Sequence, residues 1–482
     1  MTVNGIQENL QDKKYLKKSE FIAYLVAVFF YTNMTGMVGS YRNAYLVNVL
    51  HLTEDQNSFF QVMCNVVPFV LNFFIAMYID GRKVGKQGKF RPVVTLIAIP
   101  LAILMLLSFW APKALTGTLL MVYIVTVAIL WGASTTFGNT VNMLAVVMTP
   151  NLKERDSVMS FRGIASAVGN SAPLVIVLVI GLIWKDEGTQ YIISAALCGV
   201  VGVLTMLLGM RVTKERVVYD EKRKNPLIGF IDILSNKYAW VIIISEFLKN
   251  FRSIANFMGV FLAAALLGST SKFLLFGLPT GIGTAVGMLV INFLLKKFNS
   301  KVLYIASGIY SVIANTAAFA VGYAYFKSGS TALQIVFILF LFLIGLQFGA
   351  SNLLPTMFQA DVLEDMELKT GKRLDASLPF VISIGTMISG TIANALAPQI
   401  LYGNGSIIQY IQPTDLVPNP EQSLHTKIML LFFYTVFHGL MMFLGGVPFF
   451  FYKFTGKTKE DVHAAVLKQR EKLAAQQKDV AE

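Results

Sequence analysis

An acid and two bases stand inside a stretch that is otherwise largely apolar: Ser245-Glu246-Phe247-Leu248-Lys249-Asn250-Phe251-Arg252-Ser253. Apolar residues dominate from Tyr238 to Ile244 before it and from Ile254 to Leu267 after it. As one helix rising about 1.5 Å per residue, this run would hold the charges about 12 to 21 Å from its beginning. An ionised side chain at that depth in a bilayer costs several kcal/mol unless it finds a partner or water. The stretch therefore predicts a membrane-spanning helix that carries a functional site.

The composition is that of an integral membrane protein. Of 482 residues, 55% are hydrophobic and 14% are charged, whereas soluble domains carry about 25% charged residues. The net charge of +13 indicates basic loops on one side of a membrane rather than a surface for nucleic acid. Only Cys64 and Cys198 occur, both in apolar segments, which argues against a disulfide framework. Residues 1–19 lack the short apolar core of a signal peptide.

Apolar runs of about 20 residues or more recur between short charged loops, and each is long enough to cross a bilayer. They predict an all-α membrane protein with twelve transmembrane helices. A polar segment divides the helices six and six, which resembles the plan of major facilitators with two pseudo-symmetric bundles. The expected parts are an N-tail (1–19), a first bundle (20–212), a linker (213–237), a second bundle (238–455) and a C-tail (456–482).

Lysine and arginine are distributed unequally between alternate loops. Most fall in the N-tail, the C-tail and the loops that follow even-numbered helices, while the opposite loops hold only Lys113, Lys185, Lys272, Lys327 and Lys427. The positive-inside rule then predicts that both termini are cytoplasmic and that the chain is a multi-pass protein of the cytoplasmic membrane. The C-tail mixes Lys, Glu, Ala and Gln and is interpreted as a solvated or membrane-surface helix with no chemistry of its own.

Two stretches carry a family resemblance. The first, between the second and third predicted helices, is Asp80-Gly81-Arg82-Lys83-Val84-Gly85-Lys86-Gln87-Gly88-Lys89-Phe90-Arg91-Pro92. The second, after the tenth, is Ala360-Asp361-Val362-Leu363-Glu364-Asp365-Met366-Glu367-Leu368-Lys369-Thr370-Gly371-Lys372-Arg373. Together they resemble the signatures of the glycoside-pentoside-hexuronide cation symporters, the melibiose-carrier family of the major facilitator superfamily. Gln87 stands where that family usually has Trp, and Glu364-Asp365 replaces Asp-Tyr.

Both stretches suit a cytoplasmic gate. The basic side chains of the first can pair with the acids of the second when the cytoplasmic side is shut, and the pairs must break when it opens. The alternative is an ordinary positive-inside loop beside a solvated acidic helix end. The predicted gate residues are Asp80, Arg162, Asp361, Glu364, Glu367 and Arg373.

The resemblance also implies acidic side chains on the second and fourth helices, which in the family hold the coupling cation and sugar hydroxyls. Matching Asp80 to the family's loop residue puts Pro68 and Asn72 at the two positions on the second helix and Asn139 at the position on the fourth. None of the three is charged, which argues against sodium coupling through that site. No metal site and no cofactor are predicted.

Glu246 is the one acid predicted to lie away from loops, tails and terminal helical turns. Burial would allow such a carboxyl to bind a proton near neutral pH, and this makes Glu246 the candidate coupling residue. Lys249 lies three residues later on the same helix face. A charge-neutralising pair of Glu246 with Lys249 is therefore the alternative.

Two arginines predict the charge of the substrate. Tyr41-Arg42-Asn43 in the first helix matches Phe251-Arg252-Ser253 in the seventh, and these helices are equivalent in the two halves, so the guanidiniums are expected to converge near the axis between them. A planar guanidinium binds carboxylate or phosphate through two parallel hydrogen bonds, which favours an acidic sugar such as a hexuronide. Alternatively, Arg42 extends to the outer rim, Arg252 pairs with Glu246 or carbonyls, and the sugar is neutral.

Polar residues at helical spacing complete the predicted cavity, although the same residue types also hydrogen-bond helices to one another. The predicted substrate-binding residues are Tyr41, Arg42, Asn72, Asn139, Lys249, Arg252 and Asn352.

The sequence favours a secondary transporter that moves a sugar, glycoside or acidic sugar by alternating access, coupled to a proton or another cation, or uncoupled. A lysolipid carrier of the same fold is the alternative. An enzyme is not expected, because the chain has no metal-binding His pair, nucleophile elbow or nucleotide-binding glycine loop. The expected partners are the small substrate and membrane lipid but no nucleic acid, and the chain is predicted to work as a monomer.

Overall fold

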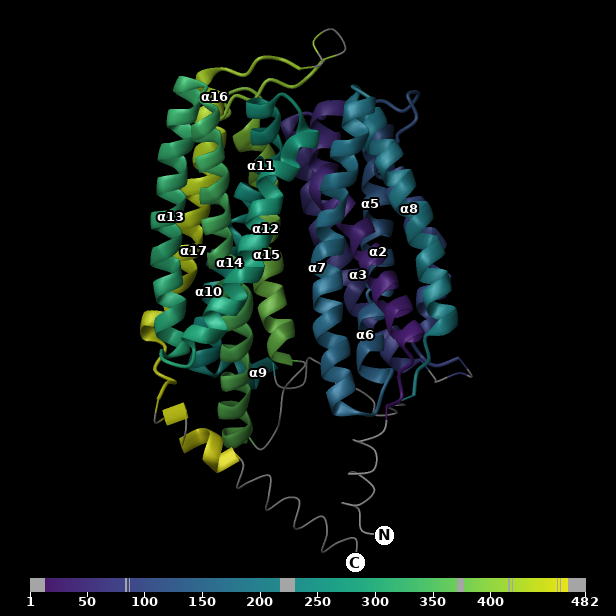
Figure 1. Cartoon of the computed structure of the whole chain (residues 1–482), viewed down its shortest axis with the longest axis vertical. Helices are drawn as coiled ribbons and strands as arrows, with labels where there is room; N and C mark the ends of the chain where they lie inside the picture. Colours follow the sequence, from purple (N-terminus) through teal and green to yellow (C-terminus); the bar gives the residue numbers. More distant parts are fainter. Residues whose placement is uncertain are drawn as a thin grey trace, which may run out of the picture. The chain divides into compact units, whose positions relative to one another are not determined.

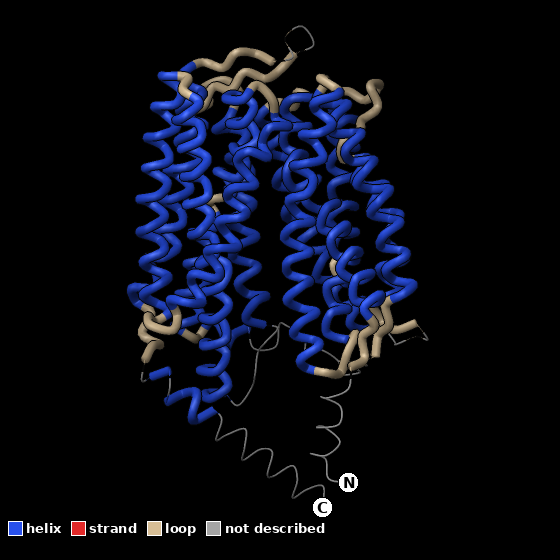
Figure 2. Tube along the Cα trace, viewed as in Figure 1, coloured by secondary structure: helices blue, strands red, loops and turns tan. Residues whose placement is uncertain are grey.

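The structure is a computed structural model that describes residues 14–82, 85, 87–216, 230–370, 377–414, 417, 419–456, 458–459 and 461–466. Helices make up almost all of it, and no strand occurs among these residues (Figure 2). The chain forms two compact units. Unit 1 consists of Met1–Arg223, Ala263–Leu274 and Pro398–Gln422, and unit 2 of Lys224–Leu262, Leu275–Ala397 and Ser423–Glu482.

The helices of each unit run side by side (Figure 1). Unit 1 contains α2 (Lys18–Ala44), the π-helical turn η1 (Tyr45–Val49), α3 (Glu54–Gly81), α4 (Arg91–Leu107), α5 (Gly117–Gly138), α6 (Thr140–Val147), α7 (Leu152–Ile183), α8 (Glu187–Val212) and the 3-10 turn η2 (Thr270–Phe273). Unit 2 holds α9 (Phe230–Leu234), α10 (Lys237–Asn250), α12 (Leu274–Leu294), α13 (Ser300–Ser328), α14 (Thr331–Thr370), α16 (Leu424–Phe432), the π-helical turn η3 (Phe433–Phe437), α17 (His438–Gly446) and the 3-10 turn η4 (Val447–Phe451). Two helices, α11 (Ser253–Leu267) and α15 (Ser377–Leu401), begin in unit 2 and end in unit 1.

The lengths and outer faces of the helices fit a membrane. Within the described residues, eleven segments are long and apolar enough to cross one, and α4 is a shorter apolar helix of 17 residues. Large apolar side chains point outward, among them Leu96, Leu119 and Leu289, which are 75%, 67% and 70% exposed. Such faces need no protein cover in lipid, and helices satisfy their own backbone hydrogen bonds there. The prediction of an all-α, multi-pass membrane protein is confirmed.

Glycines allow two pairs of helices to approach closely. A Cβ on Gly36 of α2 would lie 2.3 Å from the carbonyl oxygen of Asn170 in α7. A Cβ on Gly287 of α12 would lie 2.2 Å from the carbonyl oxygen of Leu346 in α14, and one on Gly349 would lie 2.3 Å from the carbonyl carbon of Gly287. Small residues are used in this way in membranes, where dispersion contacts between backbones hold helices together.

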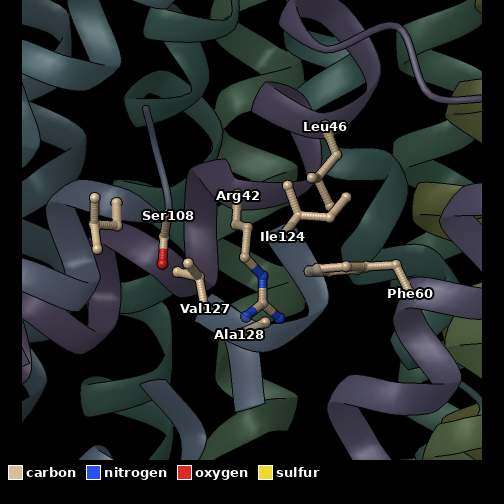
Figure 3. Close-up of a pocket in the computed structure, with 8 residues that line it drawn as sticks. Arg42, Leu46, Phe60, Ser108, Ile124, Val127 and Ala128 are labelled. Carbon is tan, nitrogen blue, oxygen red and sulfur yellow. The ribbon is translucent and has the colours of Figure 1, made fainter. Parts of the chain in front are cut away.

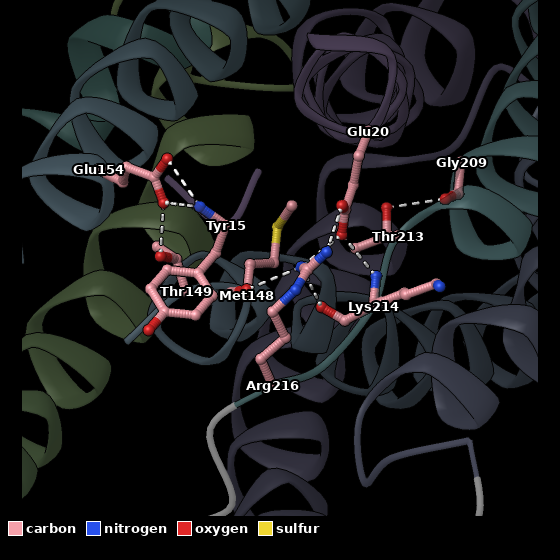
Figure 4. A network of polar contacts seen from close by, with 9 residues as sticks. All are labelled: Tyr15, Glu20, Met148, Thr149, Glu154, Gly209, Thr213, Lys214 and Arg216. Carbon is pink, nitrogen blue, oxygen red and sulfur yellow. Dashed lines mark hydrogen bonds and ion pairs between the residues drawn. The ribbon is translucent and has the colours of Figure 1, made fainter. Parts of the chain in front are cut away.

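A buried acid connects two segments of the chain at the end of unit 1 where α2 begins (Figure 4). Glu20, in the first turn of α2, is 3% exposed and forms an ion pair of 2.7 Å with Arg216, which follows α8. The carboxylate also accepts a hydrogen bond of 2.8 Å from the backbone N–H of Lys214. The hydrogen bond with Glu20 raises the pKa of Arg216, and the ion pair joins the start of α2 to the segment that follows α8.

A second acid organises the loop before α4. The Glu215 carboxylate accepts hydrogen bonds of 2.8, 2.8 and 2.7 Å from the backbone N–H groups of Lys89, Phe90 and Arg91. These donors lie at the start of α4, where helical N–H groups lack intrahelical partners and attract a negative charge. Gly88 precedes them with a φ of 92°, a left-handed conformation that favours glycine.

We predict that Gly88→Ala lowers the thermal stability of the detergent-purified protein. The new Cβ would lie 2.3 Å from the carboxyl carbon of Glu215, and the positive φ alone costs about 1–3 kcal/mol. The apparent Tm should fall by several degrees in a fluorescence-monitored melt.

Gly85→Ala in the same loop is the matched control, because its Cβ would meet nothing closer than 3.9 Å. Equal Tm values for Gly88→Ala and Gly85→Ala would contradict this account of the loop.

Candidate functional site

Arg42 lies in unit 1 in an apolar pocket without a counter-charge (Figure 3). Its guanidinium carbon is 5.2 Å from the centre of the Phe60 ring of α3. The pocket is lined by Arg42, Leu46, Phe60, Leu107, Ser108, Ile124, Val127 and Ala128. Nε of Arg42 is buried without a hydrogen-bond partner, and no acid among the described residues lies within ion-pair distance of it. A guanidinium can bind an anion through two parallel hydrogen bonds, and an anion-binding role for Arg42 stays a prediction.

Arg252 has similar surroundings in unit 2. Its guanidinium carbon lies 5.1 Å from the centre of the Phe348 ring of α14. In the described part of the chain it forms no ion pair, although Glu246 lies close enough to interact with it electrostatically. Next to Phe348, with ring centres 5.0 Å apart, is His438 of α17. Nε2 of His438 is buried and also lacks a hydrogen-bond partner.

Both arginines lie beside irregular backbone. The prediction of one continuous helix through Tyr238–Leu267 is wrong, because α10 ends at Asn250 and α11 begins at Ser253, with Arg252 in the break. The Asn250 side chain donates to the carbonyl oxygen of Thr386 in α15 at 2.7 Å and so holds the broken end in place. Arg42 lies in the last turn of α2, directly before the π-helical turn η1. Such interruptions recur at functional sites in membrane proteins.

The predicted coupling residue is ion-paired. Glu246 and Lys249 form a salt bridge within α10, and their side chains are 16% and 8% exposed. Lys249 packs closely on α17, since a Cβ on Gly445 would lie 2.9 Å from its Cβ. The pair neutralises both charges in this conformation, which is the alternative that the sequence left open for these two residues. The coupling role of Glu246 stays a prediction.

The other predicted substrate residues are dispersed over several helices. Asn72 of α3 accepts a hydrogen bond from the Thr136 hydroxyl of α5. Asn139 occupies the break between α5 and α6, where its side-chain oxygen accepts from Asn142 at 2.6 Å. Asn352 is exposed on α14. Tyr41 is fully buried, and its ring lies 5.5 Å from that of Tyr191 rather than beside the Arg42 guanidinium. Their substrate roles stay predictions.

The predicted gate acids have partners that the sequence analysis did not identify. Asp361 of α14 pairs with Lys459 at 2.7 Å, and Glu364 pairs with His463 at 3.1 Å. Both partners belong to the C-tail, whose helical residues 458–459 and 461–466 also bury Val466 to 1% exposure. The described part of the C-tail therefore packs against α14 and is not fully solvated, and the interpretation of the C-tail as a segment without chemistry stays a prediction. Residues 459, 463 and 466 lie on one helix face, a spacing that the sequence already contained.

The remaining gate residues are described only in part. The side chain of Asp80 and the whole of Arg373 lie outside the described residues. Nη1 of Arg162 in α7 donates to the carbonyl oxygen of Asn142 in α6 at 3.3 Å. Glu367 is half-buried near the end of α14. Gating by these residues stays a prediction.

A family model described as "MFS/sugar transport protein" matches residues 23–456. The uncharacterised symporter YjmB of Bacillus subtilis (strain 168) is 26% identical over 391 residues, which is 78% of this chain and 79% of YjmB. YagG of Escherichia coli (strain K12), named as a candidate glycoside/cation symporter, is 23% identical over 407 residues, 80% of each chain.

A third relative and a solved structure extend the comparison. A protein of Escherichia coli (strain K12) named as a candidate 2,3-dihydroxypropane-1-sulfonate exporter is 23% identical over 425 residues, 84% of this chain and 82% of the relative. The crystal structure of a D-xylose-proton symporter has a TM-score of 0.61 at 16% identity and covers 92% of this chain and 99% of its own, which is a likeness of fold. Because the family model spans nearly the whole chain, the protein belongs to the MFS/sugar transport family, whose members are membrane transporters and not enzymes, and the resemblance to melibiose-carrier-like symporters is confirmed.

Proposed function

We propose that the protein is a secondary transporter that carries an acidic sugar or glycoside across the cytoplasmic membrane by alternating access. It has twelve spans in two six-helix bundles (20–212 and 238–455), with α4 as the short third span and both termini in the cytoplasm. The family description and the names of two relatives support a sugar or glycoside substrate and symport. The same comparisons favour a sugar over a lysolipid. The transporter works as a monomer.

The observation that carries the acidic substrate is a pair of guanidiniums without counter-ions. Arg42 and Arg252 each lie over a phenylalanine ring, and neither has an acid within ion-pair distance among the described residues. A charge held in apolar surroundings is costly unless an opposite charge joins it. A sugar carboxylate supplies that charge and matches the planar fork. One relative is named for an anionic sulfonate, which is in keeping with this choice.

We predict that Arg42→Gln and Arg252→Gln each reduce uptake of an acidic glycoside far more than uptake of its neutral counterpart. Loss of a hydrogen bond to a charged group costs about 1.5–3 kcal/mol, so kcat/KM for methyl glucuronide should fall about 10- to 100-fold in proteoliposomes. Uptake of methyl glucoside should change little.

Lys113→Gln serves as the control, because it removes an exposed positive charge far from either arginine in sequence. If both arginine variants transport methyl glucuronide at the wild-type rate, the acidic-substrate proposal fails.

The coupling ion is proposed to be a proton, with Glu246 as its carrier. The salt bridge with Lys249 occupies the Glu246 carboxylate, so the proposed proton transfer requires that Lys249 moves away or that the substrate takes over one of the two charges. Proton binding at Glu246 and substrate binding at Lys249 are thereby linked, because the two residues lie within one turn of α10. The absence of carboxylates at positions 68, 72 and 139 supports a proton over sodium.

We predict that Lys249→Met destabilises the protein strongly, by about 3–5 kcal/mol, because it leaves the Glu246 carboxylate half-buried without its partner. Glu246→Gln combined with Lys249→Met should restore most of the lost Tm in detergent melts, since both charges are then gone.

The double variant also separates coupling from binding. If Glu246 carries the proton, this variant should still exchange methyl glucuronide across the membrane but should no longer accumulate it when a pH gradient is imposed. Accumulation at the wild-type level would remove Glu246 from the coupling mechanism.

A further inference from the structure

One acidic side chain outside the proposed site is held by residues from three distant parts of the chain. Glu187 begins α8 at the end of unit 1 opposite the N-terminus. Thr270 of η2 and Tyr410 reach this end of unit 1 from the segments Ala263–Leu274 and Pro398–Gln422. Glu187 is not among the residues predicted from the sequence to have a role, because an acid in the first turn of a helix is ordinary.

The Glu187 carboxylate has a complete set of neutral hydrogen-bond partners. Its Oε1 accepts from the Thr270 hydroxyl at 2.7 Å, and its Oε2 accepts from the Asn48 amide at 3.0 Å. The Tyr191 hydroxyl lies 3.4 Å from Oε2 and 2.6 Å from the Thr270 hydroxyl oxygen. Tyr410 donates to Oδ1 of Asn48 at 3.4 Å, which leaves the amide N–H₂ of Asn48 directed at the carboxylate.

The partners of this carboxylate are buried, although the Glu187 side chain itself is only partly buried. Thr270 and Tyr191 are fully buried, and Asn48 and Tyr410 are 6% exposed. In the described part of the chain no basic group pairs with Glu187. Burial without a counter-ion disfavours a carboxylate relative to the neutral acid.

The charged groups nearest in sequence have other positions. Lys185 and Asp186 are exposed on the preceding turn, where Asp186 caps α8 through the backbone N–H of Thr189. On η2, Lys272 donates to the carbonyl oxygen of Leu267 at 2.7 Å. The other titratable groups that face Glu187 are phenols of α2, α8 and the 398–422 segment: Tyr41, Tyr191 and Tyr410.

The Thr270 and Tyr191 hydroxyls can form hydrogen bonds with Glu187 in either of its protonation states. With Glu187 ionised, Thr270 donates to it and Tyr191 donates to Thr270. With Glu187 protonated, the acid donates to Thr270, Thr270 donates to Tyr191, and Tyr191 donates back to the second carboxyl oxygen. Only hydroxyl hydrogens rotate between the two arrangements, because Ser, Thr and Tyr hydroxyls both donate and accept.

Two tyrosines support this assignment independently. Burial, and after it the Glu187 carboxyl, raise the pKa of Tyr410, so that its phenol keeps its proton and continues to orient Asn48. The fully buried Tyr41 hydroxyl, close enough to Glu187 to interact with it electrostatically, has no hydrogen-bond partner. An unpaired buried hydroxyl is rare in folded proteins, and a rearrangement of the hydrogen bonds around Glu187 would give it a partner.

We propose that Glu187 is a proton-binding site that controls closure of the outer end of the transporter. The inference rests on the proposed alternating-access function and on cytoplasmic termini, which put Glu187 on the external side. When Thr270 and Tyr410 pack around the Glu187 carboxyl, they favour its neutral form. When they move away, the carboxyl is exposed to water and ionises. External acid therefore favours the closed outer end, and alkali favours the open one.

The first test needs no substrate. Infrared difference spectra of the purified protein, recorded across a pH titration, should contain the carbonyl band of a buried carboxylic acid. Glu187→Gln should abolish the band, and Thr270→Val should shift it because the acid loses its hydrogen-bond partner. Asp186→Asn, which removes the neighbouring carboxylate while keeping a good helix cap, should leave it unchanged. A wild-type spectrum without the band, or a band that survives in Glu187→Gln, overturns the proposal.

The second test measures closure itself. Hydrogen exchange of the 263–274 and 398–414 segments, corrected for its intrinsic pH dependence, should increase several-fold in the wild type and in Asp186→Asn when the pH is raised. In Glu187→Gln, which mimics the neutral acid, protection should stay high at every pH. A wild-type pH response in Glu187→Gln contradicts the proposal. Both tests give their answer even if methyl glucuronide proves not to be a substrate.

Discussion

A charge in the membrane interior must be neutralised, and this constraint governs the few charged side chains that lie inside the spans. Glu246 is paired with Lys249 within a span, and at the helix ends Glu20 is paired with Arg216 and Asp361 with Lys459. Arg42 and Arg252 are exceptions among the described residues, as neither has an acidic partner. Because desolvating a lone charge is so costly, such exceptions persist only where a ligand or a change of state supplies the missing charge. That reasoning, rather than the family name, is the basis on which we propose an anionic substrate.

The membrane also explains how much of the fold could be predicted. Length and hydrophobicity define spans almost alone, because every spanning segment must satisfy its backbone internally. The interruption at Phe251–Arg252 could not be predicted in this way, since the stretch contains neither proline nor glycine. It is held by Asn250, whose side chain reaches α15 at Thr386, a residue 136 positions away. Contacts of that range leave no periodic signal in a sequence.

The charged residues of the candidate site could be predicted from the sequence, but most of their ion-pair and hydrogen-bond partners could not. Glu246, Lys249, Arg42 and Arg252 could be identified because charged residues are rare within apolar, membrane-spanning runs. The partners of Asp361 and Glu364 were missed, since a helical C-tail rich in lysine is usually solvated. The Glu187 cluster was missed for a different reason: each of its residues is unremarkable alone, and only the fold brings Asn48, Tyr191 and Thr270 together.

Because α14 is long, a small tilt of this helix displaces its C-terminal end by a large distance. Forty residues make a rod of about 60 Å, roughly twice the hydrocarbon thickness of a bilayer, about 30 Å. Asp361 therefore lies well along a lever arm, about 45 Å from the start of the helix. A tilt of about 10° moves a point about 45 Å away by about 8 Å, which is more than the 2.7 Å that separates Lys459 from Asp361 in their salt bridge. The ion pair between Asp361 and Lys459 can therefore survive a tilt of α14 only if the C-tail moves together with that helix.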